Sequence, residues 1–572
     1  MATFSKTPSS THSHSPSKLS NNQPQLKNQS SSHMFYSNKT GVYTSTHPPI
    51  TLPSDPFLDV VSHIFSNKHE GKTALVDAAS GVSILYSQLQ PLIKSVASGL
   101  HQMGVAQGDV ILILLPNSIY YPIIVLGVLY LGAVVTTTNP LSSFSEVKKQ
   151  AAACHVSMAF TVLDKADELN SIGIQSVVVP ENVRFDSNQV EFAPFYKLIS
   201  GDGDFVASRT VRQDDTAAIL YSSGTTGASK GVVLSHRNLI CGVELFVRFE
   251  ASQYEFRPEE NVYLAVVPMF HIYGLVLFIM GILSLGTKIV VMKKFSVDEM
   301  VRCVDRYGVT HFPGVPPLVT ALIKAGKGGV GERLRSLKQV SCGAAPLSTK
   351  TIEEFAHRFP QVDFIQGYGM SESTAVGTRG FNTQDVHNYA SAGLLAPNMQ
   401  AKVVDWVTGS HLPPGKTGEL WLSGPAIMKE YLNNVEATSS TIDKDGWLHT
   451  GDIVYFDQDG YLYIVDRVKE MIKYKGFQIA PADLEDVLAS HPAILDAAVT
   501  GIRDEEAGEI PVAFVVMKPG AEASESSIID FVAKEVAPYK KVRRVMFTNM
   551  IPRSAAGKIL RRQFKDQIDS RL

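Results

Sequence analysis

A short glycine- and hydroxyl-rich segment, from Tyr221 to Gly231, holds the residues best suited to chemistry. Glycines let backbone N–H groups approach a ligand closely, and a lysine supplies a mobile positive charge. Apolar runs precede and follow the segment, which predicts a strand, a tight turn and a second strand. Crowded donors with one cation favour a polyphosphate, although a flexible hairpin is the alternative for this stretch alone. The donors are Ser222, Ser223, Gly224, Thr225, Thr226 and Lys230.

This segment does not follow the Walker A pattern, which needs Gly, four residues, and then Gly-Lys-Ser/Thr. Counted from Gly224, Ser229 stands where the second glycine belongs. Gly231 stands where Ser or Thr should follow the lysine. A different phosphate-binding loop is therefore indicated.

Further along the chain, other turns carry groups that could complete a nucleotide site. In the segment Gln366 to Glu372, Tyr368 offers a ring to stack on a base, Ser371 a hydroxyl, and Glu372 a carboxylate suited to Mg²⁺. Asp452 follows a tight turn and could accept hydrogen bonds from ribose hydroxyls. Each motif alone could be an ordinary turn. The remaining motifs are Asp466 to Glu470, Lys473 to Gln478 and Pro552 to Lys558.

Composition limits the class of protein. The chain has 572 residues, 44% of them hydrophobic, which is enough for a large core and more than one domain. A net charge of -3 argues against nucleic acid as the main partner. Its 4 cysteines lack CxxC spacing, so neither a disulfide framework nor a zinc site is indicated. The apolar stretches 119–135 and 262–287 are interrupted or short, and we expect buried elements rather than membrane spans.

The order of elements predicts an α/β protein. Residues 1–54 are rich in Ser, Thr, Asn and Pro, and we expect a disordered tail. Between 298 and 403, helical and strand-like segments alternate, which indicates layered α/β structure with parallel strands. Short strands and turns follow residue 401, and a compact α+β unit of about a hundred residues ends the chain.

Together these motifs resemble, in order and approximate spacing, the adenylate-forming superfamily of acyl-CoA synthetases, luciferases and peptide-synthetase adenylation domains. Within it the chain looks most like plant 4-coumarate:CoA ligases and their ligase-like relatives. The segments that carry this resemblance are 267–274, 315–317, 445–452 and 473–481.

The resemblance implies a large N-terminal domain (55–465) of layered α/β subdomains plus a β-rich subdomain. A hinge (466–470, centred on Lys469) would lead to a small mobile α+β domain (471–569). Two half-reactions would share one site: ATP and a carboxylate give an acyl-adenylate and pyrophosphate, and coenzyme A then displaces AMP.

Roles for individual residues also follow from the resemblance. The loop 222–230 would hold the β- and γ-phosphates, Lys558 would bridge the α-phosphate and the carboxylate, and His271 would border the acyl channel. Thr226 and Glu372 would place Mg²⁺. Lys473 would act in the thioester step. The other expected nucleotide and coenzyme A contacts are Ala345, Gln366, Gly367, Tyr368, Ser371, Asp452, Arg467, Lys294, Lys475 and Gly476.

The expected acyl pocket, formed by Tyr273, Leu277, Ser341 and Gly343, departs from true 4-coumarate ligases. Ser341 stands where those enzymes carry a lysine and cannot reach a phenol hydroxyl in the same way. Leu277 replaces a polar group. We therefore expect a cinnamate-like, fatty or oxylipin-type acid, with 4-coumarate as the alternative.

Three other activities compete with a CoA ligase: a luciferase-like oxygenase, a peptide-synthetase adenylation domain, and a non-catalytic adenylate-binding protein. No carrier domain follows Leu572, and the expected key residues are all present. The final Ser570-Arg571-Leu572 resembles the Ser-Lys-Leu peroxisomal address, so we expect an import receptor as a partner. We also expect a monomer.

Overall fold

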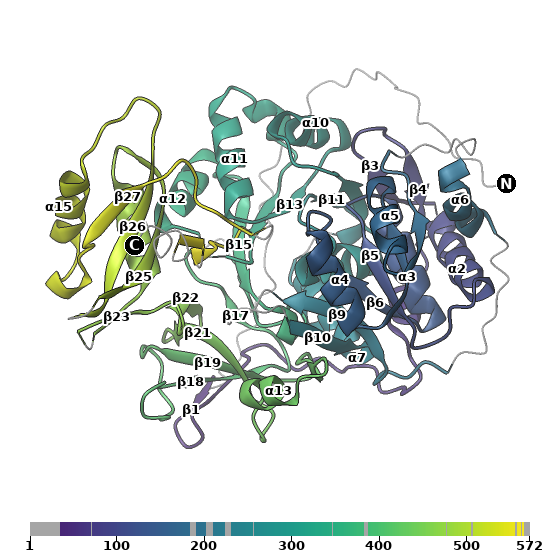
Figure 1. The fold of residues 1–572 in the computed structure, drawn as a ribbon, viewed down its shortest axis with the longest axis horizontal. Coiled ribbons are helices and arrows are strands. Elements are labelled where there is room, and N and C mark those ends of the chain that lie inside the picture. Colours follow the sequence, from purple (N-terminus) through teal and green to yellow (C-terminus); the bar gives the residue numbers. More distant parts are fainter. Residues whose placement is uncertain are drawn as a thin grey trace.

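A computed structural model describes residues 35–69, 71–182, 190–201, 210–222, 230–254, 257–345, 347–382, 387–475, 477–504, 507–554, 557–561 and 563–564. Its chain forms a large N-terminal body of sheets and helices and a small C-terminal domain (Figure 1). The small domain, with β25, β26, β27 and α15, lies at the opposite end of the molecule from α2 and α6. The α/β class predicted from the sequence is confirmed.

One mostly parallel sheet carries the strands on either side of the expected phosphate turn. Strands β9 and β10 are antiparallel, and Lys230 stands opposite Ser222, so the predicted strand–turn–strand pattern is confirmed at both ends. The turn itself, 223–229, lies outside the described residues. In order across the described sheet, the strands are β20 (Glu430–Tyr431), β10 (Lys230–Ser235), β9 (Thr216–Ser222), β6 (Val134–Thr137), β5 (Val110–Leu114), β7 (Val156–Thr161) and β8 (Gln175–Val178).

A second sheet delivers the expected adenine segment. Its parallel strand β15 ends at Tyr368 and pairs antiparallel with β16, the strand that holds Arg379. Across the described sheet the order is β17 (Leu394–Leu395), β16 (Thr378–Arg379), β15 (Asp363–Tyr368), β14 (Gln339–Cys342), β13 (His311–Gly314), β11 (Val262–Ala265), β12 (Lys288–Val291), β3 (Thr73–Asp77) and β4 (Ser83–Leu85).

Helices bury the apolar runs of this body. The charge-free run from Ile119 forms α3, which is apolar all round and almost wholly buried, as a core helix should be. No helix among the described residues is long and apolar enough to cross a bilayer. The helices are α1 (Val60–Ile64), α2 (Tyr86–Gln102), α3 (Tyr120–Leu131), α4 (Phe144–Ala153), α5 (Leu163–Asn170), α6 (Ala193–Ser200), α7 (His236–Gly242), α8 (Phe249–Ser252), α9 (Ile272–Gly274), α10 (Val297–Tyr307), α11 (Pro316–Lys327), α12 (Thr349–Arg358) and α13 (Val435–Thr441).

Two of these helices widen into π-helical turns next to the expected acyl channel. The segment Val243–Arg248 joins α7 to α8, and Leu275–Ile282 continues α9. Such turns often mark functional sites, because the extra residue shifts the side chains around the helix axis. The second charge-free stretch is therefore strand, loop and buried helix, as predicted.

A third, antiparallel sheet contains the expected ribose residues. It also includes residues that we expected to belong to a disordered tail. It includes β1 and β2, so the expected tail is wrong for its last part: residues from Phe35 onward are folded. Tyr43 is fully buried and stacks on Phe456 at 4.5 Å, because aromatic side chains within this Ser-rich segment supply a core contact that overall composition hides. The described strands are β1 (Tyr36–Ser37), β2 (Val42–Thr44), β18 (Gln400–Val404), β19 (Gly418–Ser423), β21 (Leu448–Phe456) and β22 (Leu462–Arg467).

The C-terminal domain is α+β with its own apolar core. The expected hinge overlaps β22, which ends at Arg467, and only 468–470 form a turn. The described elements of this domain are β23 (Ile472–Tyr474), β24 (Phe477–Ile479), α14 (Pro481–Ser490), β25 (Ile494–Asp504), β26 (Gly508–Met517), α15 (Glu525–Glu535) and β27 (Arg544–Phe547).

Candidate active site

A buried acid, a base and a phenol from three strands meet at the edge of the second and third sheets. Arg467 Nε lies 2.9 Å from Asp452 Oδ1, and the Tyr368 hydroxyl donates to Asp452 Oδ2 at 2.6 Å. Burial and the Asp452 carboxylate raise the pKa of Tyr368 well above its usual range, so its phenol keeps its proton. Asp452 is 4% exposed; Arg467 balances its charge, and the neutral Tyr368 hydroxyl adds a hydrogen bond. The predicted adenine and ribose residues are thus adjacent in the structure.

A second acidic group, Glu372, lies between the first and second sheets. Its Oε1 accepts hydrogen bonds from Ser222 Oγ at 3.1 Å and from the Tyr431 hydroxyl at 2.8 Å. Lys230 Nζ lies 4.7 Å from the centre of the Tyr431 ring. The strand ends on either side of the expected phosphate turn therefore place a lysine near the carboxylate.

Oxygen donors of this kind suit Mg²⁺, which commonly uses one or two carboxylates together with substrate phosphates. No group of three or more His, Cys, Asp or Glu side chains forms a metal cage among the described residues. Glu372 therefore fits a Mg²⁺ site made of one or two carboxylates and the substrate phosphates. Thr226, the other expected Mg²⁺ residue, lies outside the described residues.

Lys558 of the C-terminal domain faces the acid and base of the large body. A Cβ on Gly557 would lie 3.2 Å from Pro317, so the loop that holds Lys558 packs against the start of α11. Burial and, to a smaller extent, the positive charge of Arg467 lower the pKa of Lys558 to about 8, while Glu470 and Asp452 oppose this shift. The loop that holds Lys558 in the small domain therefore packs against the large body near Asp452 and Arg467.

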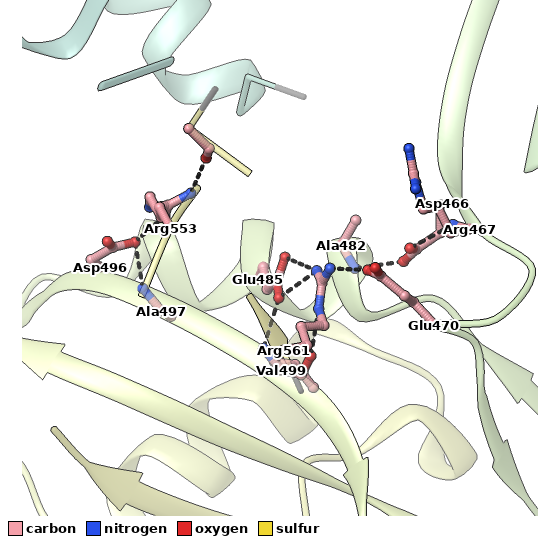
Figure 2. A network of polar contacts seen from close by, with 11 residues as sticks. Asp466, Arg467, Glu470, Ala482, Glu485, Asp496, Ala497, Val499, Arg553 and Arg561 are labelled. Carbon is pink, nitrogen blue, oxygen red and sulfur yellow. Dashed lines mark hydrogen bonds and ion pairs between the residues drawn. The ribbon is translucent and has the colours of Figure 1, made fainter. Parts of the chain in front are cut away.

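A network of polar contacts holds this loop to the predicted hinge. Figure 2 shows Arg561 between Glu470, which follows β22, and Glu485 of α14. Arg561 Nη2 lies 2.7 Å from both Glu485 oxygens, and its Nε donates to the Val499 carbonyl at 2.9 Å. Asp466 accepts from the Ala482 N–H at 3.0 Å, and burial raises its pKa to about 6. Lys558, three residues before Arg561, is thereby held relative to the hinge.

A cavity of about 50 Å³ lies beside the adenine segment, and three residues expected at the acyl channel, His271, Tyr273 and Gly343, line it. His271, which precedes α9, accepts the Tyr273 N–H on its Nδ1 at 3.3 Å, so its proton resides on Nε2. Burial lowers the pKa of His271 to about 4, which keeps the ring neutral. Residues that line the cavity include Phe246, His271, Tyr273, Gly343, Gly367, Tyr368 and Arg379.

The other two expected pocket residues do not line this cavity. Ser341 Oγ is 3.3 Å from the Tyr273 hydroxyl, and Leu277 lines a smaller cavity of about 10 Å³. Ser341 is therefore already paired with a neighbouring side chain.

A buried ion pair that the sequence did not reveal stands between these two cavities. Arg379 Nε lies 2.5 Å from Glu250 Oε2, and the guanidinium carbon lies 4.9 Å from the centre of the Phe246 ring. Both residues are 7% exposed. Arg379 lines the larger cavity and Glu250 the smaller one.

The residues expected to serve coenzyme A are not gathered around this site. Lys473 lies exposed on β23 and is not among the cavity-lining residues, while its N–H donates to Glu509 at 2.8 Å. Lys475 and Lys294 are also exposed. Gly476 lies outside the described residues. A thioester-forming site would therefore require the domains to move.

The remaining expected residues are distributed as follows. Gln366 donates to the Tyr389 carbonyl at 2.6 Å, and Ser371 is buried beside Glu372. Ala345 is half-buried. Lys469 is exposed, and burial together with Lys230 lowers its pKa. Ser223, Gly224 and Thr225 lie outside the described residues.

Comparison with known proteins identifies the family and supports the fold. The family model of the AMP-binding enzymes matches residues 63–432, and that of the AMP-binding enzyme C-terminal domain matches 483–558. The ATP-bound structure of MatB from Rhodopseudomonas palustris aligns with a TM-score of 0.81 at 26% identity, over 89% of this chain and 98% of that one.

This chain belongs to the AMP-binding enzyme family, whose adenylate-forming members use ATP and coenzyme A. It is 58% identical over 543 residues to "4-coumarate--CoA ligase-like 6" of Arabidopsis thaliana, covering 94% of this chain and 96% of that protein. It is 44% identical over 531 residues to "Peroxisomal OPC-8:0-CoA ligase 1" of the same plant, covering 92% and 96%. The fold and family predicted from the sequence are confirmed, and the chain is an ATP-dependent acid:CoA ligase.

Proposed function

We propose that this ligase activates a cinnamate-like, fatty or oxylipin-type carboxylic acid in peroxisomes and supplies the thioester for β-oxidation. The main support for an adenylation site is that Lys558 of the small domain lies near the Asp452–Arg467 pair of the large body. When bound, Mg-ATP supplies an α-phosphate that the acid attacks, which gives the acid a leaving group better than oxide.

The chain's own residues account for what that step needs. Negative charge builds on phosphate oxygens, so positioned cations and donors lower the barrier. Lys558 would neutralise charge where carboxylate and phosphate meet, Lys230 would hold the terminal phosphates, and Glu372 would hold Mg²⁺. Asp452 and Arg467 would bind the ribose.

The cavity beside this site would receive the acid. His271, neutral and with its proton on Nε2, would border the reacting carboxylate. Phe246 and Tyr273 offer apolar ring surface, their centroids 6.4 Å apart. These walls suit an acyl group of moderate width.

For the second half-reaction, rotation about Lys469 would remove Lys558 and bring Lys473 to the acyl carbon. Lys475, Gly476 and Lys294 would contact coenzyme A. Lys473 is exposed and away from the cavity while Lys558 is near Asp452 and Arg467, and this contrast supports such a division of labour.

The test is a thioester-formation assay on the purified chain with ATP, Mg²⁺ and coenzyme A over a panel of cinnamates, fatty acids and cyclopentenone acids. A ligase consumes coenzyme A and releases AMP in equal amounts with at least one acid. AMP without thioester, with light emission, would identify luciferase-like chemistry. Strong preference for 4-coumarate would instead support phenylpropanoid metabolism.

A further inference from the structure

A buried charge pair borders the space proposed for the acid, because Arg379 lines the larger cavity and Glu250 the smaller one. The guanidinium of Arg379 has five N–H donors, of which one is used by Glu250. Within the described residues, Arg379 makes no other side-chain hydrogen bond. A Cβ placed on Gly367 would lie 2.9 Å from Arg379 Nη1, so this end of the guanidinium lies against the adenine segment and the larger cavity.

Burial makes these open donors significant. Charged groups removed from water are costly unless their remaining hydrogen-bonding capacity is satisfied. Arg379 is 7% exposed, which leaves little bulk water to serve its terminal nitrogens. A bound molecule in the cavity is the natural source of the missing acceptor.

The charges that line the two cavities define which acceptor fits. Among the described lining residues, Arg379 and Glu250 are the charged ones, since burial lowers the pKa of His271 to about 4 and that of His311 to about 3. The charges of Arg379 and Glu250 cancel, so the lining has no net charge. A second carboxylate would add an unbalanced negative charge beside Glu250, whereas a neutral oxygen accepts a hydrogen bond and leaves the balance intact.

We propose that Arg379 is a specificity-determining residue that donates to a neutral oxygen acceptor, such as a ketone, on the acyl part of the substrate distant from its carboxylate. Glu250 is a positioning residue that orients the guanidinium. This inference rests on the proposed function, because it assigns the larger cavity to the acid.

The experiment compares matched acids on the unmodified protein. Straight-chain acids of about six to about twelve carbons are each paired with an acid of equal length that carries a ketone at its penultimate carbon. At the best length, kcat/KM for the keto acid should exceed that for its parent by roughly tenfold to a hundredfold, the range expected for one hydrogen bond to a charged group. The dicarboxylic acid of that length should be poorer than the keto acid.

Variants then assign the preference to the ion pair. Arg379→Met should reduce the keto-to-parent ratio to about one, and so should the double variant Arg379→Met/Glu250→Gln, which leaves no buried unpaired charge and protects against misfolding. Arg333→Met removes an exposed arginine paired with Asp305 at 2.9 Å and should keep the ratio. The ratio is measured within each variant, so a general loss of stability does not change it.

Keto and parent acids used equally at every length, or a dicarboxylic acid preferred, would overturn the inference while leaving the ligase itself intact. A ratio unchanged in both Arg379 variants would also overturn it. If no acid in any class yields a thioester, the proposed function fails instead.

Discussion

The Tyr431 hydroxyl donates a 2.8 Å hydrogen bond to Glu372 Oε1, the carboxylate that we propose holds Mg²⁺. The same ring lies under Lys230 Nζ, 4.7 Å from its centre. One tyrosine from the short edge strand β20 therefore contacts both the expected metal ligand and the expected phosphate lysine.

Tyr431→Phe should separate these two contacts, because phenylalanine keeps the ring under Lys230 and loses the hydroxyl. Groups that orient a metal ligand typically contribute tenfold or more to affinity, so the Mg²⁺ concentration for half-maximal adenylation should rise by roughly tenfold. Tyr455→Phe, which removes a tyrosine hydroxyl from β21 of the third sheet, is the control. An unchanged Mg²⁺ requirement would show that the hydroxyl does not orient Glu372.

Lys558 and Lys473 should serve different half-reactions. Lys558→Ala should slow adenylate formation by roughly 10²–10³-fold and spare thioester formation from supplied acyl-adenylate, because only Lys558 is beside Asp452 and Arg467. Lys473→Ala should do the reverse. Pyrophosphate release and thioester formation are measured separately, and equal damage to both steps by both variants would contradict the assignment.

The pH profile of the adenylation step should carry the signature of Lys558. Its pKa in the free protein is lowered to about 8, so the lysine is charged below that pH and loses its charge as the pH rises through it. For ATP, kcat/KM should therefore decline on the alkaline side with an apparent pKa of about 8. Lys558→Arg should shift that decline to higher pH, and a profile identical in both proteins would rule out this lysine as the titrating group.

Breaking the Arg561 network should affect the small domain and the adenylation step together. Arg561→Met leaves Glu470 and Glu485 without their cation, and breaking such a buried pair commonly costs about 3–5 kcal/mol. Denaturant unfolding and pyrophosphate release report the two effects, while thioester formation from supplied adenylate should fall less. Lys540→Met is the control: it breaks the ion pair with Asp483, which is more exposed than the Arg561 pairs, and should cost no more than about 1 kcal/mol. Equal losses in the two variants would contradict a special role for Arg561.

Location should depend on the last tripeptide. A fluorescent protein fused ahead of the chain should accumulate in peroxisomes, and deletion of Leu572 should leave it outside them, since the receptor reads a free C-terminal tripeptide. Co-localisation with a peroxisomal marker measures both fusions. The same distribution for both would remove the support for β-oxidation.

Local sequence signals predicted much of the fold and part of the site. Strands β9 and β10 follow from apolar runs around a glycine-rich turn, and Tyr368 follows from turn chemistry at a strand end. The tight turn expected before Asp452 was wrong, because Asp452 lies within the continuous strand β21. Long-range pairing was beyond such signals. Arg379 and Glu250 are 129 residues apart, and neither stands in a motif. A lone arginine among small and apolar residues was the available hint.

The same limitation explains the error at the start of the chain. Composition averages over many residues, whereas Tyr43 is held by particular distant partners, the Phe456 ring and the Leu412 carbonyl. The Arg561 network was missed for a similar reason, because Glu470, Glu485 and Arg561 belong to separate motifs that only the folded small domain joins.

The pairing of β2 with β18 has a consequence for synthesis on the ribosome. Thr44 pairs with Gln400, so the first strands to leave the exit tunnel must wait for more than half of the chain before their partner exists. Such a distant closure makes the third sheet, which also bears Asp452 and Arg467, a late event in folding. A truncation that removes the polar segment 1–54 would delete β1 and β2 and would remove the contact of Tyr43 with Phe456. It would change no residue of the candidate active site.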